Sequence, residues 1–225
     1  MMKKLLPLLP VFILMLNSCI GVHADIQMRR DGSGRITLEY KLSRMAETIG
    51  RLDGNEQWPI IPVGRADWER TTARIDDMRL VSFSSREDAK DIVSRVTLEF
   101  RNTEALIKFL DSYAGEPSRP GGGRASINRE NNLNKLNIIL NKPAASEINP
   151  DLMDLMKQVC AGYKFNISFR AQGNPSMVFT DGAGKTIIQP AEINTAASGR
   201  TVSFAIDTAE IINKKEGLGV IFSWQ

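Results

Sequence analysis

The chain has 225 residues, 42% of them hydrophobic, which is enough for one large domain or two small domains with buried cores. It carries 29 basic and 26 acidic residues, and two of the basic ones, Lys3 and Lys4, stand at the very start. This near-balance of charge argues against a nucleic-acid partner, because phosphate binding requires Lys and Arg clustered on one face. We therefore expect no nucleic acid among its partners.

The first residues have the pattern of a bacterial export signal. The two lysines are followed by an uncharged apolar run over residues 5–16 and then by Leu16-Asn17-Ser18-Cys19. Basic, then apolar, then small residues are typical of a signal peptide rather than of a folded domain. The apolar run is shorter than the ~20 residues of a spanning helix, and two prolines interrupt it. We predict that residues 1–18 are a signal peptide.

Two cleavage sites compete at the end of this segment. Leu16-Asn17-Ser18-Cys19 resembles a lipobox, in which a signal peptidase cuts before a cysteine that carries diacylglycerol, although Asn17 departs from the usual small or apolar residue. Val22-His23-Ala24 instead fits the small-x-small pattern of the ordinary secretory peptidase, whose soluble product would begin at Asp25. We favour the lipobox, because a signal peptide is not expected to place a cysteine there by chance.

The lipobox predicts lipid attachment at Cys19, followed by a lipidated tether over residues 19–23. Each buried methylene contributes about 0.8 kcal/mol, so two or more acyl chains such as palmitate hold a protein on a membrane almost permanently. We therefore expect the membrane as a partner through the lipid on Cys19. The expected location is the cell envelope, on the extracytoplasmic side of a membrane, either facing the periplasm or at the surface.

A segment rich in glycine and proline divides the rest of the chain. Residues 115–123 contain two prolines and four glycines, which cannot continue a helix or a central strand. The segment is interpreted as a linker or as a long loop, between an N-terminal half over residues 24–114 and a C-terminal half over residues 124–225. Whether the two halves are independent domains is left open by the sequence.

Both halves combine predicted strands and helices. In the first half we predict strands at 24–30, 35–40, 78–83 and 92–100, and helices after Ser43, at 66–73 and after Asn102. In the second half we predict strands at 125–129, 133–140, 163–169, 176–180, 185–188, 201–206 and 219–224, and helices at 150–160 and 207–215. Asp-Gly turns at 31–34 and 181–184 favour hairpins, because such tight turns join only antiparallel neighbours. The predicted fold is α+β, with antiparallel β-hairpins and sheets and about four packed helices.

The chain offers few residues for catalysis. The histidine at position 23 is the sole one, so serine and cysteine nucleophiles lack a general base and a zinc site lacks ligands. Cys160 lies on the apolar stripe of the helix predicted at 150–160 and is interpreted as a core residue. In Asp181-Gly-Ala-Gly-Lys185, a phosphate-binding loop would need glycine where Phe179 stands. We predict no enzymatic activity and no catalytic, metal or cofactor site.

One segment carries a resemblance to a known family. Cys19, followed over residues 26–45 by a strand, a Gly-rich turn, a second strand and a capped helix, resembles the LppM-type domain of bacterial envelope lipoproteins. The resemblance implies an α+β envelope domain without a known enzymatic activity, and it supplies no functional residue beyond Cys19. The predicted function is a non-enzymatic binding or scaffold module with an envelope protein partner. The alternatives are a carrier or sensor of an apolar ligand, lined by Met153 and Met156, and the secreted form cut after Ala24.

Overall fold

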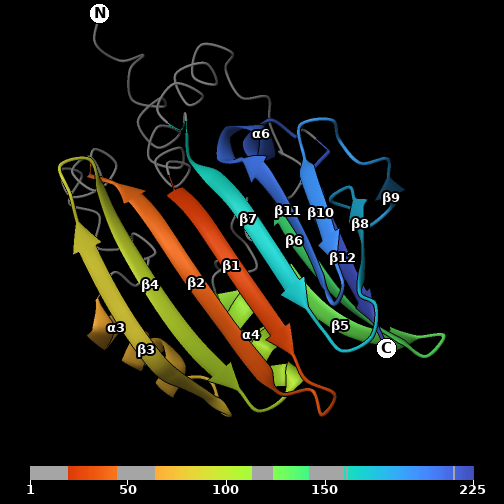
Figure 1. Cartoon of the computed structure of the whole chain (residues 1–225), viewed down its shortest axis with the longest axis horizontal. Helices are drawn as coiled ribbons and strands as arrows, with labels where there is room; N and C mark the ends of the chain where they lie inside the picture. The colour runs from red at the N-terminus through yellow and green to blue at the C-terminus, as the bar shows by residue number, and fades with distance from the viewer. Residues whose placement is uncertain (1–19, 45–63, 113–123, 142–159, 161, 215) are drawn as a thin grey trace, which may run out of the picture.

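The computed structural model describes residues 20–44, 64–112, 124–141, 160, 162–214 and 216–225 (Figure 1). Its first sheet has the strand order β10 (Asn194–Ser198), β11 (Thr201–Asp207), β7 (Lys164–Arg170), β1 (Ile20–Met28), β2 (Gly34–Ser43), β4 (Asp91–Phe100) and β3 (Met78–Glu87). Its second sheet has the order β5 (Arg124–Glu130), β6 (Leu133–Asn141), β12 (Leu218–Trp224), β8 (Ser176–Thr180) and β9 (Thr186–Ile187). The helices are α3 (Arg65–Ala73), α4 (Thr103–Ser112) and α6 (Thr208–Asn213).

The fold is mostly β, so the predicted α+β class with about four packed helices is wrong. The described parts of the chain contain twelve strands but only three helices, of 9, 10 and 6 residues. Strands run further than hydrophobic alternation predicts, because polar residues continue the ladders. In β3, residues 84–87 are all exposed yet still pair with β4. The helices predicted after Ser43 and at 150–160 lie outside the described residues.

The two predicted hairpin turns are confirmed. In the first turn, Asp31 accepts hydrogen bonds from the backbone N–H of Ser33 at 3.0 Å and from its hydroxyl at 2.7 Å. In the second turn, Asp181 accepts hydrogen bonds from two backbone N–H groups, each at 2.9 Å. Each turn contains a glycine with positive φ, Gly32 at 81° and Gly184 at 86°. The turns join antiparallel neighbours, β1 with β2 and β8 with β9.

A parallel pairing joins the two halves of the chain in one sheet. Strand β1 pairs in parallel with β7, from Val22 opposite Phe165 to Gln27 opposite Arg170. The sequence predicted only antiparallel neighbours. Residues 20–23, predicted to be a tether, are instead the beginning of β1, which is a central strand between β2 and β7. The predicted linker at 115–123 lies outside the described residues.

The two sheets pack face to face through aromatic side chains. The ring of Phe169 on β7 stacks on that of Phe222 on β12, with centroids 4.9 Å apart, and lies 5.0 Å from that of Trp224. Phe179 on β8 meets Phe204 on β11 edge to face, with centroids 5.5 Å apart. Burial of each such side chain contributes about 1.5–3 kcal/mol, so these contacts hold the sheets together.

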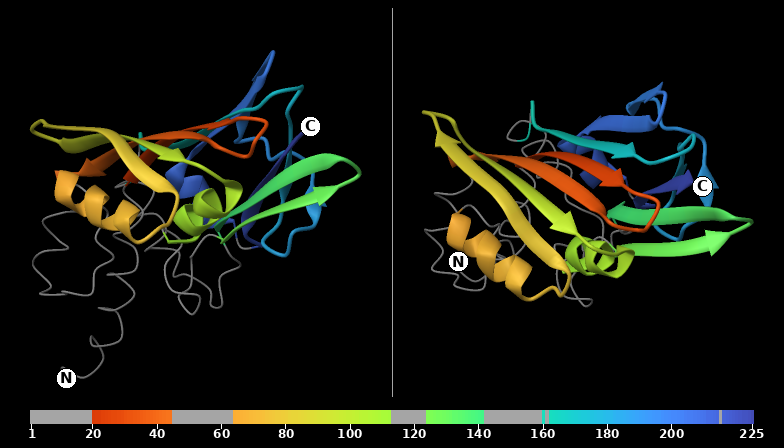
Figure 2. Two further views of the ribbon diagram at one scale, coloured as in Figure 1. Left: turned by 90° about the horizontal axis from the view of Figure 1, so that it is seen from below. Right: turned by 60° about the horizontal axis from the view of Figure 1, so that its bottom comes forward.

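Two helices cover the rest of the inner face of the first sheet (Figure 2). On α3, Trp68 is fully buried, and its ring stacks on that of Tyr40 from β2 with centroids 5.9 Å apart. The same indole lies 6.4 Å from the ring of Phe109 on α4. None of the helices in the described ranges has the length and apolar character of a membrane span. The opposite, outer face of the first sheet carries mainly polar side chains.

Candidate functional site

The cysteines and methionines singled out by the sequence are placed only in part. Cys19, the predicted lipid-attachment residue, precedes Ile20 of β1 and lies outside the described residues, as do Met153 and Met156. Cys160 is 1% exposed and clusters with Ala209 of α6, which confirms its predicted burial. Within the described ranges, no three His, Cys, Asp or Glu side chains come together as a metal site would require.

A row of polar side chains crosses the outer face of the first sheet. Each member lies directly opposite the next on the neighbouring strand: Thr201, Arg170, Gln27, Arg35, Glu99 and Arg79. Because adjacent strands are about 4.8 Å apart, opposite residues of this kind are within reach of one another's side chains. The row therefore places arginines from β7, β2 and β3 along one line of the sheet.

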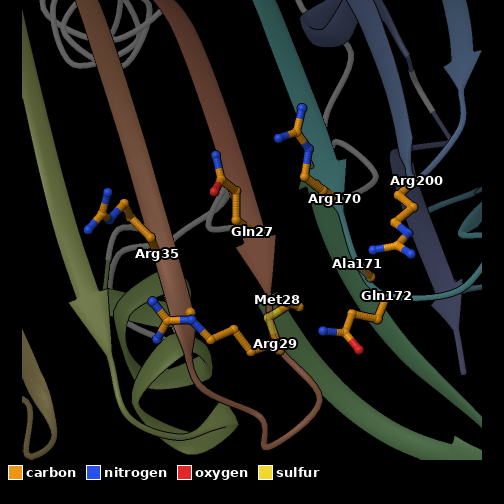
Figure 3. A pocket seen from close by; sticks show the side chains of 9 residues that line it. Gln27, Met28, Arg29, Arg35, Arg170, Ala171, Gln172 and Arg200 are labelled. Atoms are coloured by element: carbon orange, nitrogen blue, oxygen red, sulfur yellow. The ribbon is translucent and has the colours of Figure 1, made fainter.

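A groove of about 240 Å³ lies beside Arg170, Gln27 and Arg35 of this row, near the ends of β1 and β7. Its polar lining consists of Gln27, Arg29, Arg35, Arg170, Gln172 and Arg200. Figure 3 shows Arg29 and Arg35 on the β1–β2 side, and Arg170 and Arg200 on the β7–β11 side together with Ala171. We call this feature the arginine groove. Its nine lining residues include no carboxylate.

The arginines of the groove differ in how their charge is balanced. Arg35 forms an ion pair with Glu99 at 2.7 Å. Arg29 donates to the Ser33 hydroxyl at 3.3 Å, and Arg170 donates to a threonine hydroxyl at 3.1 Å, so both contact neutral oxygens. Within the described part of the chain, neither Arg170 nor Arg200 forms an ion pair. The groove therefore carries excess positive charge on its β7–β11 side.

The carboxylates near the groove already have hydrogen-bond or ion-pair partners. Asp25 accepts a hydrogen bond from the Gln27 amide at 3.0 Å. Asp31 belongs to the hairpin turn, where the Ser33 hydroxyl and N–H hold its pKa below the ordinary value. Glu99 also accepts a hydrogen bond from Arg79 at 2.9 Å, so one carboxylate is shared by two guanidinium groups. Hydrogen bonds from Arg35 and Arg79 lower the pKa of Glu99 from 4.5 to about 2.

This pKa predicts a pH dependence of stability. Since the Glu99 carboxyl has a lower pKa when folded, its contribution to the free energy of unfolding is complete above pH 4.5 and is lost as the pH falls toward about 2. We expect Glu99→Gln to flatten this part of the stability profile, measured by urea unfolding between about pH 6 and about pH 3. Glu104→Gln, which removes an exposed carboxylate from α4, is the control and should retain the wild-type acid dependence. Equal profiles for wild type and Glu99→Gln would contradict this assignment.

The lining of the arginine groove supports binding rather than bond making. Arginine stays protonated, and glutamine, methionine, alanine and glycine supply neither an acid–base group nor a nucleophile. A second, more open hollow of about 410 Å³ lies over β1, β7, β11 and β10. Polar side chains such as His23 and Asn166 share its lining with Ile167 and Phe204.

Sequence reasoning missed the arginine groove. Its arginines lie as far apart in the chain as Arg29 and Arg200, and residues 19–225 carry a net charge of only +1, so no basic patch is visible along the sequence. Only the parallel pairing of β1 with β7 brings them together. The available signal was Arg35 at an outward position of the strand predicted at 35–40, and Arg170 directly after the strand predicted at 163–169.

Comparisons with known proteins give one weak structural likeness. No protein-family model matches the chain, and no curated protein matches it. Among solved structures, the chain is similar to the folded domain of the LppM protein of Mycobacterium tuberculosis, determined by NMR. The identity is 11%, the TM-score is 0.40, and the match covers 84% of this chain and 90% of that chain. The LppM-type resemblance predicted from Cys19 and residues 26–45 is thus accompanied by a weak overall likeness.

Proposed function

We propose that this protein is a lipoprotein of the bacterial cell envelope, anchored through Cys19, and that its folded domain is a non-enzymatic binding module. The observation that carries the anchor is the position of β1. The strand begins at Ile20 and lies between β2 and β7, so the folded domain starts immediately after the lipobox cysteine. A cut before Cys19 then leaves the lipid-bearing cysteine next to the first residue of this strand.

The same observation argues against cleavage after Ala24. That cut would remove residues 20–24 from a central strand, where they pair with Leu42 through Leu38 of β2. It would also remove the pairing of Val22 through Ala24 with β7. A cut there would shorten a central strand of the product on both of its paired sides, whereas a cut before Cys19 leaves all of β1 intact. This supports the lipobox over the secretory site.

If Cys19 carries the lipid, its replacement should remove the lipid from the protein. Cys19→Ala should abolish incorporation of labelled palmitate, because the acyl chains are attached through this thiol. The variant should accumulate as a precursor or leave the detergent phase in a partition experiment. Cys160→Ala is the matched control, because it removes the other cysteine, which is buried, and it should label as the wild type does.

The mature N-terminus gives a second, independent readout. Mass spectrometry of the wild-type protein should show a lipid-bearing or blocked Cys19. A free N-terminal Asp25 would overturn the proposal, because the Val22-His23-Ala24 site would then be the one in use. Palmitate incorporation that persisted in Cys19→Ala would overturn it as well.

A further inference from the structure

We infer that the arginine groove is a binding site for a phosphate group. This deepens the proposed function, because it rests on the domain being a binding module and names the class of ligand. The assignment of a phosphate site does not depend on the lipid at Cys19, which precedes the opposite end of β1. Only the choice between a free phosphate compound and a lipid headgroup uses the position of that lipid. The inference is carried by the arrangement of the arginines, by their charge balance and by the absence of a carboxylate from the lining.

The arrangement of the row suits a doubly charged anion. Arg170 and Arg35 lie on either side of Gln27 in register, on strands β7, β1 and β2, which puts their backbones about 10 Å apart. Figure 3 shows Gln27 between the two long side chains. An anion placed over Gln27 would lie beside Arg170 on one side and beside Arg35, which is ion-paired with Glu99 of β4, on the other. Arg200 adds a third donor group on the β11 side.

The charge balance favours a ligand that brings negative charge. Arg170 forms its hydrogen bond with a neutral hydroxyl at 3.1 Å, and no described carboxylate forms an ion pair with Arg200. Arg35 shares Glu99 with Arg79, so that single carboxylate balances only one of two positive charges. The positive charge left over lies in a hollow rather than on a flat surface, which concentrates its field.

The chemistry of the donors favours phosphate over a simple carboxylate. A guanidinium group presents several N–H donors in a planar fork that matches two oxygens of a phosphate. Arginines on both sides of the groove could each bind a pair of oxygens, whereas a carboxylate has only one such pair to offer. The amides of Gln27 and Gln172 in the lining are further hydrogen-bond donors for phosphate oxygens.

The position of the groove favours a free phosphate compound over a headgroup of the host leaflet. The nine residues of β1 span about 27 Å, and the groove is at the end of the strand remote from Ile20. A phosphate compound away from the membrane surface is therefore the expected ligand. The same chemistry in a lipid headgroup would require the strand to lie along the membrane.

The test compares two variants with the same net charge. The mature lipoprotein in detergent is titrated by calorimetry with inorganic phosphate and with pyrophosphate. Arg170→Gln combined with Arg200→Gln should weaken binding at least 10-fold, since two of the guanidinium groups that line the groove are lost. Arg74→Gln combined with Arg86→Gln, which removes two exposed arginines elsewhere, should leave binding within about 2-fold of wild type. Arg170→Lys keeps the positive charge but loses the planar pair of N–H donors, and we expect it to weaken binding too.

Each outcome bears on the inference. Equal weakening by the two double variants would overturn it, because only general electrostatic attraction would be at work. Lack of binding by the wild type to phosphate, to pyrophosphate and to phosphatidylglycerol vesicles would overturn it as well. Binding to those vesicles alone, lost in Arg170→Gln with Arg200→Gln, would support the phosphate site with a headgroup as its source. Cys19→Ala should bind pyrophosphate as the wild type does, so failure of the anchor and failure of the groove are distinguishable.

Discussion

Replacement of Phe222 with alanine should lower the free energy of unfolding by about 3–5 kcal/mol, because it opens a cavity where the two sheets meet. Phe222 is fully buried on β12. Its ring lies 4.9 Å from that of Phe169 and 6.4 Å from that of Phe204, both on the first sheet. For a chain of this size the midpoint of thermal unfolding falls by about 2–4 °C per kcal/mol. Urea and thermal unfolding followed by circular dichroism would measure the effect.

Val178→Ala is the control for this prediction. Val178 also lies in the second sheet, on β8, but it is 42% exposed. Its truncation should change stability by less than about 0.5 kcal/mol, as is usual for exposed positions. If Phe222→Ala were no more destabilising than Val178→Ala, the aromatic contacts between the sheets would contribute little to stability, contrary to the packing described above.

A shared core also determines how the chain should unfold. The inner faces of both sheets contribute to one cluster of buried residues, which includes Ile26, Leu98, Leu136 and Phe222. Neither sheet can expose its inner face without exposing that of the other. The N-terminal and C-terminal halves are therefore expected to unfold together, although the sequence alone left their independence open.

The local parts of the fold were predictable from the sequence because their causes are local. Asp31 and Gly32 create a tight turn through hydrogen bonds and a positive φ that involve only their neighbours. Alternating apolar residues identified the inner face of each flanking strand. The same logic placed β8 at residues 176–180, with the bounds that the structure has. Short-range chemistry is sufficient for hairpins.

Pairing across long distances was not predictable, because alternation gives the face of a strand and not its partner. Nothing in Val22 or Phe165 indicates that the two lie opposite each other in parallel strands. Strand β10 (Asn194–Ser198) was missed for another reason. All five of its residues are exposed, so it lacks the apolar alternation by which strands are recognised. Exposed polar strand residues, as in β10 and at the end of β3, explain why the strand content was underestimated and the predicted fold class was wrong.

The arginine groove follows from the long-range pairing and so could not be predicted either. The parallel alignment of β1 with β7 places Gln27 opposite Arg170, and the hairpin then places Arg35 beside Gln27. Each arginine by itself is an ordinary solvated residue on a strand. Their combined charge becomes a feature only when the register is known.

A chain that begins at Asp25 should be much less stable than one that begins at Ile20. The shorter chain lacks residues 20–24 of β1, which pair with β2 and of which 22–24 also pair with β7, so ladder hydrogen bonds are lost on both sides of a central strand. Each lost hydrogen bond costs about 0.5–1.5 kcal/mol net, and the total stability of a domain is typically only about 5–15 kcal/mol. The midpoint of urea unfolding, followed by circular dichroism, should therefore fall sharply or the chain should fail to fold.

A chain that begins at Val22 separates this effect from the mere loss of length. It lacks only Ile20 and Gly21, which pair with β2 but precede the register with β7, so it should have intermediate stability. The expected order is thus Ile20, then Val22, then Asp25. If the chains beginning at Ile20 and Asp25 unfolded at the same urea concentration, residues 20–24 would contribute nothing to the sheet. Cleavage after Ala24 would then be compatible with the fold, and the structural argument for processing at Cys19 would be lost.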